Sequence, residues 1–297
     1  MGGTAADISP QRNRSVFLFA IYLIERKEAL MNIIVLVKQV PDMEKVKFDR
    51  EKGVVDRSSA SAEINPFDLN ALETAVQIAE SIDARVIAVS MGPPSTESAL
   101  KECIARGAHE GVLVSDGKFG GSDTKATSTI LAGAIKKLGA YDLVIAGEKT
   151  VDGDTGQVGP EVAEFLDIPH ASYVSKIIEI NKNNMEVHSE IWEGTYLKSI
   201  KFPCLITVTK DINHPRLPSF KNKMKARKAE IKVLKLEDLK EFLNEEDVGF
   251  KGSSTKVKKI EVPKIEKRQG KIYRESDTVK AENELIDIFK KIKVLEG

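Results

Sequence analysis

The chain has 297 residues, of which 41% are hydrophobic and 30% are charged, a balance typical of globular proteins. Its 45 basic and 45 acidic residues cancel, so no overall field favours nucleic acid or a membrane surface as a partner. Cys103 and Cys204 are too few for a disulfide framework, and four scattered histidines argue against a metal site. We therefore expect a cytoplasmic protein with no bound metal, nucleic acid or membrane.

Residues 1–30 differ from the remainder of the chain. Arginines precede an apolar run at 16–24, which is too short to cross a bilayer and has no small-residue cleavage site after it. Met31 begins a clean strand pattern, and residues 25–28 can be encoded by purine-rich codons that resemble a ribosome-binding site. We expect Met31 to be the real start and residues 1–30 to be a translated leader outside the fold.

From Met31 onward, short apolar runs alternate with helical patterns. The strand patterns lie at residues 32–37, 85–90, 111–114 and 141–146. Between them, apolar residues recur at helical spacing, beginning with Leu69, Leu72 and Val76. Asn65 and Ser95 are candidate N-caps, and Pro66 suits a first helical position. This alternation predicts an α/β fold with a mostly parallel sheet, whose ligands bind at the carboxyl ends of the strands.

Residues 146–166 carry the clearest sign of a ligand site. A strand ends at Ala146, a loop with acids and glycines follows, and a helix with an apolar face opens at Pro160. This arrangement binds phosphate, because the first N–H groups of a helix lack internal partners and the helix dipole favours an anion. The loop is neither a Walker A loop nor GxGxxG, so an ordinary strand–helix connection is the alternative.

Beyond this helix the pattern changes. Apolar runs at 171–180, 185–191 and 204–208 predict strands with hairpin-type connections, and residues 181–184 are the expected turn. We expect these strands to complete an α/β nucleotide-binding domain that spans residues 31–210.

The core signal fades after residue 210, where prolines and basic residues become frequent. A final helix is predicted near 281–292, with an apolar face formed by Leu285, Phe289 and Ile292. An apolar helix on so long a tail needs something to pack against. We expect residues 211–297 to form a recognition loop and a C-terminal arm that embraces a partner subunit; the alternative is a disordered tail whose helix folds onto its own core.

Four motifs follow one another along the chain: VLVKQVPD at 35–42, NPFD at 65–68, SMGP at 90–93 and GEKTVDGDTGQVGP at 147–160. In these motifs, and over essentially its whole length from Met31, the chain resembles the beta subunits of electron transfer flavoproteins. The last motif is the most specific. The resemblance implies a Rossmann-like sheet of the adenine nucleotide alpha hydrolase type with a long C-terminal arm. It also implies a heterodimer with an FAD-carrying alpha subunit.

The resemblance further implies which residues contact the nucleotide. Those in or beside the motifs are Leu36, Val37, Lys38, Asn65, Pro66, Phe67, Asp68, Met91, Gly147, Glu148, Lys149, Thr150, Val151, Asp152, Gly153, Asp154, Thr155, Gly156, Gln157 and Val158. A hydroxyl-rich helix start, similar to that of the electron-bifurcating branch of the family, adds Asp123, Thr124, Thr127 and Ser128. No catalytic side chain is implied, because the protein binds and tunes a flavin.

The identity of the nucleotide separates two functions. Ordinary members of the family hold a structural AMP, whereas the bifurcating branch holds a second FAD in the same place. Residues 152–160 are similar to the bifurcating branch, and Gly153 and Gly156 would let the backbone approach a larger ligand with a pyrophosphate.

This similarity implies that NADH gives a hydride to FAD held by this chain, which sends one electron to the alpha-subunit FAD and one to ferredoxin or flavodoxin. A carrier with structural AMP that accepts electrons from dehydrogenases is the alternative. A second alternative is a regulatory nucleotide-binding module that has neither a flavin nor a partner.

Several side chains in this region have two interpretations. Asp152 and Asp154 would form a carboxylate pair for a metal, but acids repel a phosphate unless they face the ribose, the adenine or backbone donors. We expect the two acids to face the ribose, the adenine or backbone donors, or to cap the loop. Lys149 either neutralises a phosphate or is solvated, and Cys103 and Trp192 are expected in the core.

The segment at 213–221 resembles the family's recognition loop, which docks on a partner dehydrogenase. The residues implied in docking are Pro215, Arg216, Leu217 and Phe220. An exposed aromatic side chain ringed by lysine and arginine has the composition of a binding hot spot with a steering rim. The alternative is a basic surface loop in which Phe220 is tucked inward.

Overall fold

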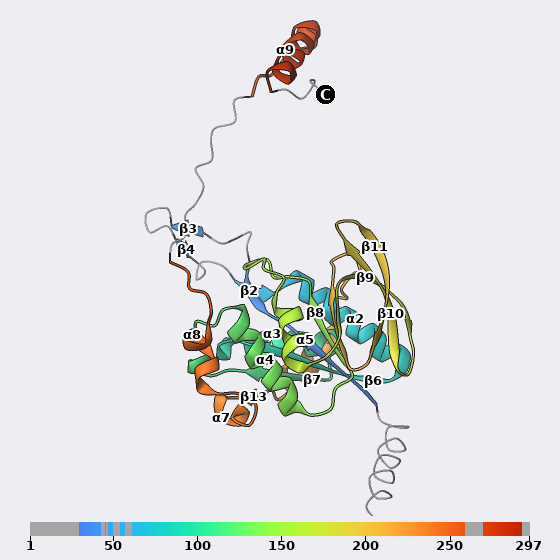
Figure 1. The fold of residues 1–297 in the computed structure, drawn as a ribbon, viewed down its shortest axis with the longest axis vertical. Helices are drawn as coiled ribbons and strands as arrows, with labels where there is room; N and C mark the ends of the chain where they lie inside the picture. The colour runs from blue at the N-terminus through green and yellow to red at the C-terminus, as the bar shows by residue number, and fades with distance from the viewer. Residues whose placement is uncertain are drawn as a thin grey trace, which may run out of the picture. The chain divides into compact units, whose positions relative to one another are not determined.

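The computed structural model describes residues 30–42, 45, 47–49, 54–56, 61–258 and 270–292 (Figure 1). Apart from Leu30, the expected leader lies outside the described residues, so it stays a prediction. The chain divides into two units, Met1–Lys258 and Lys259–Gly297. The first unit contains the sheet, and the second contains helix α9 (Thr278–Lys291), which confirms the predicted terminal helix.

A nine-stranded sheet forms the centre of the first unit, in the order β11-β10-β9-β12-β8-β1-β6-β7-β13. The parallel strands are β1 (Met31–Leu36), β6 (Ala84–Met91), β7 (Glu110–Val114), β8 (Leu143–Gly147), β9 (His170–Ile180), β12 (Cys204–Val208) and β13 (Lys232–Leu234). The antiparallel strands β10 (Asn184–Ile191) and β11 (Gly194–Lys201) extend one edge (Figure 1). The prediction of an α/β fold with a mostly parallel sheet is confirmed.

Helices cover both faces of the sheet (Figure 1). The core on one face includes α2 (Pro66–Ile82) and α3 (Glu97–Arg106), and the core on the other includes α4 (Thr124–Leu138) and α5 (Val158–Leu166). Successive strand residues point to opposite faces, so Ile33 of β1 joins the first core and Ile34 the second. Both are buried, and each such side chain stabilises the fold by about 1.5–3 kcal/mol. This explains why β1 reads as a continuous apolar run.

Shorter elements complete the chain. Two small ladders pair β2 (Gln39–Pro41) with β5 (Ala62–Ile64) and β3 (Lys47–Asp49) with β4 (Val54–Asp56). Single turns of 3₁₀ helix are η2 (Pro94–Thr96), η3 (Gly117–Phe119), η4 (Glu245–Asp247) and η5 (Glu275–Asp277). The remaining helices are α6 (Phe220–Arg227), α7 (Leu236–Leu239) and α8 (Gly249–Gly252). Among the described residues, no helix has the length and apolar character needed to cross a bilayer.

The segment between residue 210 and residue 258 contributes to the core of the first unit. Leu234 and Leu239 are buried in the same cluster as Ile34 of β1, and Val248 joins them. These apolar residues are spaced too irregularly to show a strand or helix period in the sequence, although they bury a continuous surface.

Two strand predictions were wrong or incomplete. β12 is not joined by a hairpin but lies parallel between β8 and β9. Leu205 and Ile206 are both wholly buried, which requires cover on both faces and therefore an interior position in the sheet. β11 was not predicted, because it is the last strand of the sheet and most of its side chains are exposed, which leaves little core pattern.

Trp192 is wholly exposed, so its predicted core position is wrong, whereas the predicted burial of Cys103 is confirmed. Trp192 lies in the turn between β10 and β11, where the strand ladder has ended at Ile191 and Gly194. The turn takes the indole past the last paired residues of the sheet.

Two helix starts differ from their predicted positions. Ser95 is not the N-cap of α3, because it lies within η2 and α3 begins at Glu97. α5 begins at Val158, so Pro160 is its third residue rather than its first. Proline is tolerated there because the N–H groups of a first helical turn have no intrahelical partner.

Candidate functional site

The predicted nucleotide residues gather at the carboxyl ends of neighbouring strands. β8, β1 and β6 are adjacent in the sheet and end at Gly147, Leu36 and Met91 respectively. The first turn of α2, which begins at Pro66, is hydrogen-bonded to two of these strand ends. The structure therefore brings the motifs at 35–42, 65–68 and 147–160 together at one edge, as a ligand site in a parallel sheet requires.

Asp68 joins the three segments. Its side chain is 5% exposed and accepts hydrogen bonds from the backbone N–H of Lys38 at 2.7 Å and of Gly147 at 3.2 Å. Burial raises the pKa of Asp68 to about 7, although these hydrogen bonds oppose the rise. Asp68 therefore ties the start of α2 to the ends of β1 and β8.

Asn65 holds the loop that follows β8. It occupies the N-cap position of α2, as predicted, but its side chain makes no capping hydrogen bond. The wholly buried amide instead donates to the Lys149 carbonyl at 2.9 Å and accepts from the Val151 N–H at 3.1 Å. Its two hydrogen bonds fix the backbone of the loop against α2.

The loop at 147–158 exposes backbone and small polar side chains. Asp154 and Gly156 adopt left-handed conformations with φ of 53° and 63°, which aspartate and glycine tolerate better than most residues. The Asp154 N–H donates to the Thr150 carbonyl at 2.8 Å and closes a turn. Gly153, Asp154, Thr155 and Gln157 are exposed just before α5 begins. This geometry places accessible donors beside a helix N-terminus.

The two acids of the loop each contact a lysine. Lys38 Nζ lies 2.7 Å and 2.8 Å from the two carboxylate oxygens of Asp152, and Lys149 Nζ lies 2.8 Å from Asp154 Oδ1. The hydrogen bond to Asp154 and the negative charge of its carboxylate raise the pKa of Lys149. No group of three or more histidine, cysteine or acidic residues within the described residues is arranged to hold a metal ion. The ion pair with Asp152 thus connects Lys38, which follows β1, to the loop that follows β8.

The hydroxyl-rich start of α4 is already hydrogen-bonded within the protein. Asp123 caps α4 by accepting from the Ala126 N–H at 3.0 Å. Thr124 and Ser128 donate their hydroxyls to the Glu161 carboxylate at 3.3 Å and 2.9 Å. Ser128 is wholly buried. A phosphate would reach these hydroxyls only if Glu161 moved, so their role, and that of the half-buried Thr127, stays a prediction.

Glu161 is a residue that the sequence reasoning missed. It lies in the first turn of α5 and its carboxylate links that helix to α4. The available signal was an acid beside a proposed phosphate site, which an electrostatic argument would have singled out.

A cavity of about 550 Å³ opens beside Met91 at the ends of β6 and β7. This volume lies in the range of small-molecule sites. The residues that line it are Met91, Gly92, Pro93, Pro94, Ser115, Asp116, Gly117, Phe119, Gly120 and Lys235. The cavity thus extends the candidate site from the predicted Met91 toward β13.

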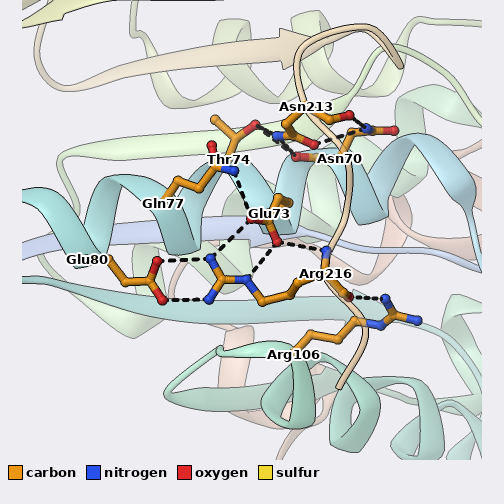
Figure 2. Close-up of polar contacts among 8 residues, drawn as sticks. All are labelled: Asn70, Glu73, Thr74, Gln77, Glu80, Arg106, Asn213 and Arg216. Atoms are coloured by element: carbon orange, nitrogen blue, oxygen red, sulfur yellow. Dashed lines mark hydrogen bonds and ion pairs between the residues drawn. The ribbon is translucent and has the colours of Figure 1, made fainter. Parts of the chain in front are cut away.

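The predicted docking residues divide into two groups. Leu217 and Phe220 are 86% and 79% exposed, so Phe220 is not tucked inward. Arg216 instead turns toward α2 and forms ion pairs with Glu73 and Glu80 (Figure 2). Pro215, the residue before Arg216, is half-buried. The loop therefore exposes two large apolar side chains beside polar residues such as His214 and Lys221, while its arginine contacts α2 of the same chain.

Comparison with known proteins gives a consistent assignment. Residues 52–239 match the electron transfer flavoprotein domain. The chain is 43% identical to the electron transfer flavoprotein subunit beta of Thermoanaerobacterium thermosaccharolyticum over 244 residues, which cover 82% of this chain and 92% of the relative. It is 41% identical to the caffeyl-CoA reductase-Etf complex subunit CarD of Acetobacterium woodii over 228 residues, 76% of this chain and 86% of the relative. It is 38% identical to the acryloyl-CoA reductase electron transfer subunit gamma of Anaerotignum propionicum over 262 residues, 86% of this chain and 97% of the relative.

The matches extend over most of this chain and most of each relative. The family match includes the loop at 147–160, the strand β8 before it and the helix α2 that contacts it. The chain therefore belongs to the electron transfer flavoprotein family, as a beta subunit with a role in electron transfer.

Proposed function

We propose that this protein is the FAD-binding beta subunit of an electron-bifurcating flavoprotein. In this proposal it pairs with an FAD-carrying alpha subunit and NADH is the electron donor. One electron passes through the alpha subunit to a partner dehydrogenase, and the other passes to ferredoxin or flavodoxin. The observation that carries the proposal is the loop at 147–158, which presents exposed backbone and small side chains at the N-terminus of α5.

The residues of this loop suit an anionic cofactor. A Cβ at Gly153 would meet only Thr150 Oγ1, at 3.5 Å, so there is open space beside the loop. Thr155 and Gln157 would donate to phosphate oxygens there, and the ion pairs with Lys38 and Lys149 offset the charges of Asp152 and Asp154, which would otherwise repel the cofactor. When bound, FAD supplies the chemistry by accepting a hydride and releasing electrons singly. The chain's own residues bind the cofactor and orient it against the sheet edge.

The names of two relatives indicate the class of partner. One is called a subunit of a caffeyl-CoA reductase complex and the other an electron transfer subunit of acryloyl-CoA reductase. We propose that the partner of this protein is likewise an enzyme that acts on a coenzyme A thioester. The exposed pair Leu217 and Phe220 would dock on it. The arm with α9 would pack against the alpha subunit.

One observation favours a second candidate, a carrier that holds structural AMP. Glu161 accepts both hydroxyls at the start of α4, where a diphosphate would otherwise find its donors. A monophosphate at the N-terminus of α5 requires no donors from α4. An AMP-bound carrier would accept electrons from dehydrogenases and would not oxidise NADH.

A bifurcating protein differs from an AMP-bound carrier in whether the reduction of ferredoxin requires simultaneous reduction of the acyl-CoA enzyme. The purified heterodimer is mixed with NADH and ferredoxin, with and without its acyl-CoA enzyme and the oxidised thioester. A bifurcating protein reduces ferredoxin only when the second acceptor is present. A carrier with AMP reduces no ferredoxin in either mixture, and that result would reject bifurcation.

A further inference from the structure

Arg216 spans two carboxylates of α2 with one guanidinium group. Its Nε lies 2.8 Å from Glu73 Oε2, and its Nη1 and Nη2 lie 2.5 Å and 2.9 Å from the two oxygens of Glu80. Nη2 also contacts Glu73 Oε1 at 3.1 Å, and the Arg216 backbone N–H donates to Glu73 Oε2 at 3.1 Å (Figure 2). The planar fork of arginine allows these simultaneous contacts, which the single ammonium of lysine does not.

Burial makes the contact with Glu73 stronger than an ordinary surface pair. The Glu73 side chain is 5% exposed, whereas that of Glu80 is 60% exposed. Burial alone would raise the pKa of Glu73, but the hydrogen bonds from Arg216 outweigh it and the pKa is lowered. The contacts with Glu80 and Glu73 raise the pKa of Arg216 in turn. Glu73 is therefore charged and depends on Arg216 for compensation.

A second set of hydrogen bonds fastens the chain just before Arg216. Asn70 Nδ2 donates to the carbonyls of Lys210 and Asn213 at 3.2 Å and 2.9 Å. Asn213 Nδ2 returns hydrogen bonds to the Asn70 carbonyl at 3.1 Å and to Thr74 Oγ1 at 2.8 Å (Figure 2). We call the contacts of Asn70, Glu73, Thr74 and Glu80 with residues 210–216 the loop clasp.

The loop clasp fixes where the exposed apolar pair begins. Leu217 follows Arg216 directly, and Arg106 of α3 holds the Arg216 carbonyl with a hydrogen bond of 2.7 Å. On the other side, Ser219 caps α6 by accepting from the Asn222 N–H at 3.1 Å, so Phe220 is the first residue of that helix. Leu217 therefore directly follows one anchored residue, Arg216, and Phe220 directly follows the other, Ser219.

We infer that Arg216 is a positioning residue, which acts on docking by holding the docking loop against α2 through Glu73 and Glu80 rather than by pairing with the partner enzyme. This inference rests on the proposed docking role of Leu217 and Phe220. It also connects that role to the nucleotide site, because α2 carries Asp68 at one end and the loop clasp along its length. Helix α2 therefore positions both the nucleotide site and the docking loop.

The substitution Arg216→Lys separates a positioning role from a charge role. Lysine keeps the positive charge near Glu73 but cannot span both carboxylates. We expect the KM for the acyl-CoA enzyme to rise roughly tenfold with kcat and flavin content unchanged, because a loosened loop must be ordered on binding. Glu73→Gln should have a similar effect. The matched control is Arg227→Lys, an exposed arginine outside the loop clasp, and it should behave as the natural protein.

Hydrogen exchange of the free heterodimer tests the loop clasp without any partner. Backbone amides at 211–217 should exchange faster in Arg216→Lys than in Arg227→Lys. The inference is overturned if the two variants exchange alike, or if Arg216→Lys keeps the KM of the natural protein. Should Phe220→Ala leave transfer unaffected while exchange still rises in Arg216→Lys, the docking role fails and the structural clasp stands.

Discussion

Gly147 and Asp68 are in direct contact where β8 ends and α2 begins. The Gly147 N–H donates to Asp68 Oδ1 over 3.2 Å. A Cβ at position 147 would lie 2.5 Å from that same oxygen and 2.8 Å from the backbone carbon of Phe67. The strand end and the helix start approach so closely that only glycine fits.

Replacing Gly147 by alanine should therefore disrupt the site. The methyl group would push α2 away from β8 and lower the free energy of unfolding by roughly 1–3 kcal/mol, with loss of bound nucleotide. Gly270→Ala is the matched control, since a Cβ there would meet no other atom within 4 Å and the residue lies outside the site. Urea unfolding and nucleotide content measure both effects. Equal behaviour of the two variants would contradict the close approach.

Asp68 should make stability depend on pH. Its pKa is about 7 in the folded protein and 3.8 in the unfolded reference, so the folded state favours the protonated carboxyl. The stability that this group contributes is complete below about pH 4 and is lost as pH rises to about 7, by up to about 1.4 kcal/mol for each pH unit. Asp68→Asn, which stays neutral, should flatten this part of the profile.

The measurement is urea unfolding of both proteins at several pH values between 4 and 8. The free energy of the natural protein, relative to that of Asp68→Asn, should fall across this interval. A constant difference would show that the fold leaves the pKa of Asp68 unshifted, and a difference that rises with pH would show that the fold lowers this pKa; either result contradicts the prediction.

The parts of this site that the sequence predicted are those with local causes. The run at 32–37 indicated a covered strand because each residue is apolar, and the loop at 147–160 was found because glycines and acids follow such a run. The helix after it was displaced by two residues because Pro160 is allowed anywhere in a first turn. Local chemistry thus located the site but left its boundaries imprecise.

The contacts that shape the site depend on tertiary structure and could not be predicted from the sequence. Arg216 and Glu73 are separated by 143 positions, and nothing in either segment indicates the other. Asn65 was interpreted as a helix cap, which is its usual role, yet its side chain bonds to the loop at Lys149 and Val151. Trp192 was placed in the core because tryptophan is usually a core residue, yet it lies in the turn between β10 and β11 and is wholly exposed.

Glu161 should weaken the binding of a diphosphate. Glu161→Gln removes the negative charge beside the hydroxyls of Thr124 and Ser128 while leaving an acceptor for them. FAD should bind the heterodimer more tightly, by roughly threefold for a screened charge. Calorimetric titration of FAD into flavin-depleted protein checks this. Glu164→Gln, an exposed neighbour on α5, is the control, and an affinity no higher than in that control would remove Glu161 from the phosphate site.

Phe220 should contribute directly to docking. Phe220→Ala removes an aromatic side chain that is 79% exposed in the free protein, so the fold should tolerate the change. The KM for the acyl-CoA enzyme should rise roughly tenfold or more, as for a binding hot spot, with flavin content intact. Trp192→Ala, which removes a wholly exposed aromatic outside the loop, should leave the KM unchanged. Transfer unchanged in Phe220→Ala would argue against docking through this loop.

The central claim is that the turn between β8 and α5 binds the diphosphate of a flavin. Counting the cofactors released when the purified heterodimer is denatured tests it most directly, with FAD and AMP separated by chromatography. We predict two FAD molecules for each heterodimer and no AMP. One FAD accompanied by one AMP would contradict the claim and leave the protein as a non-bifurcating electron carrier.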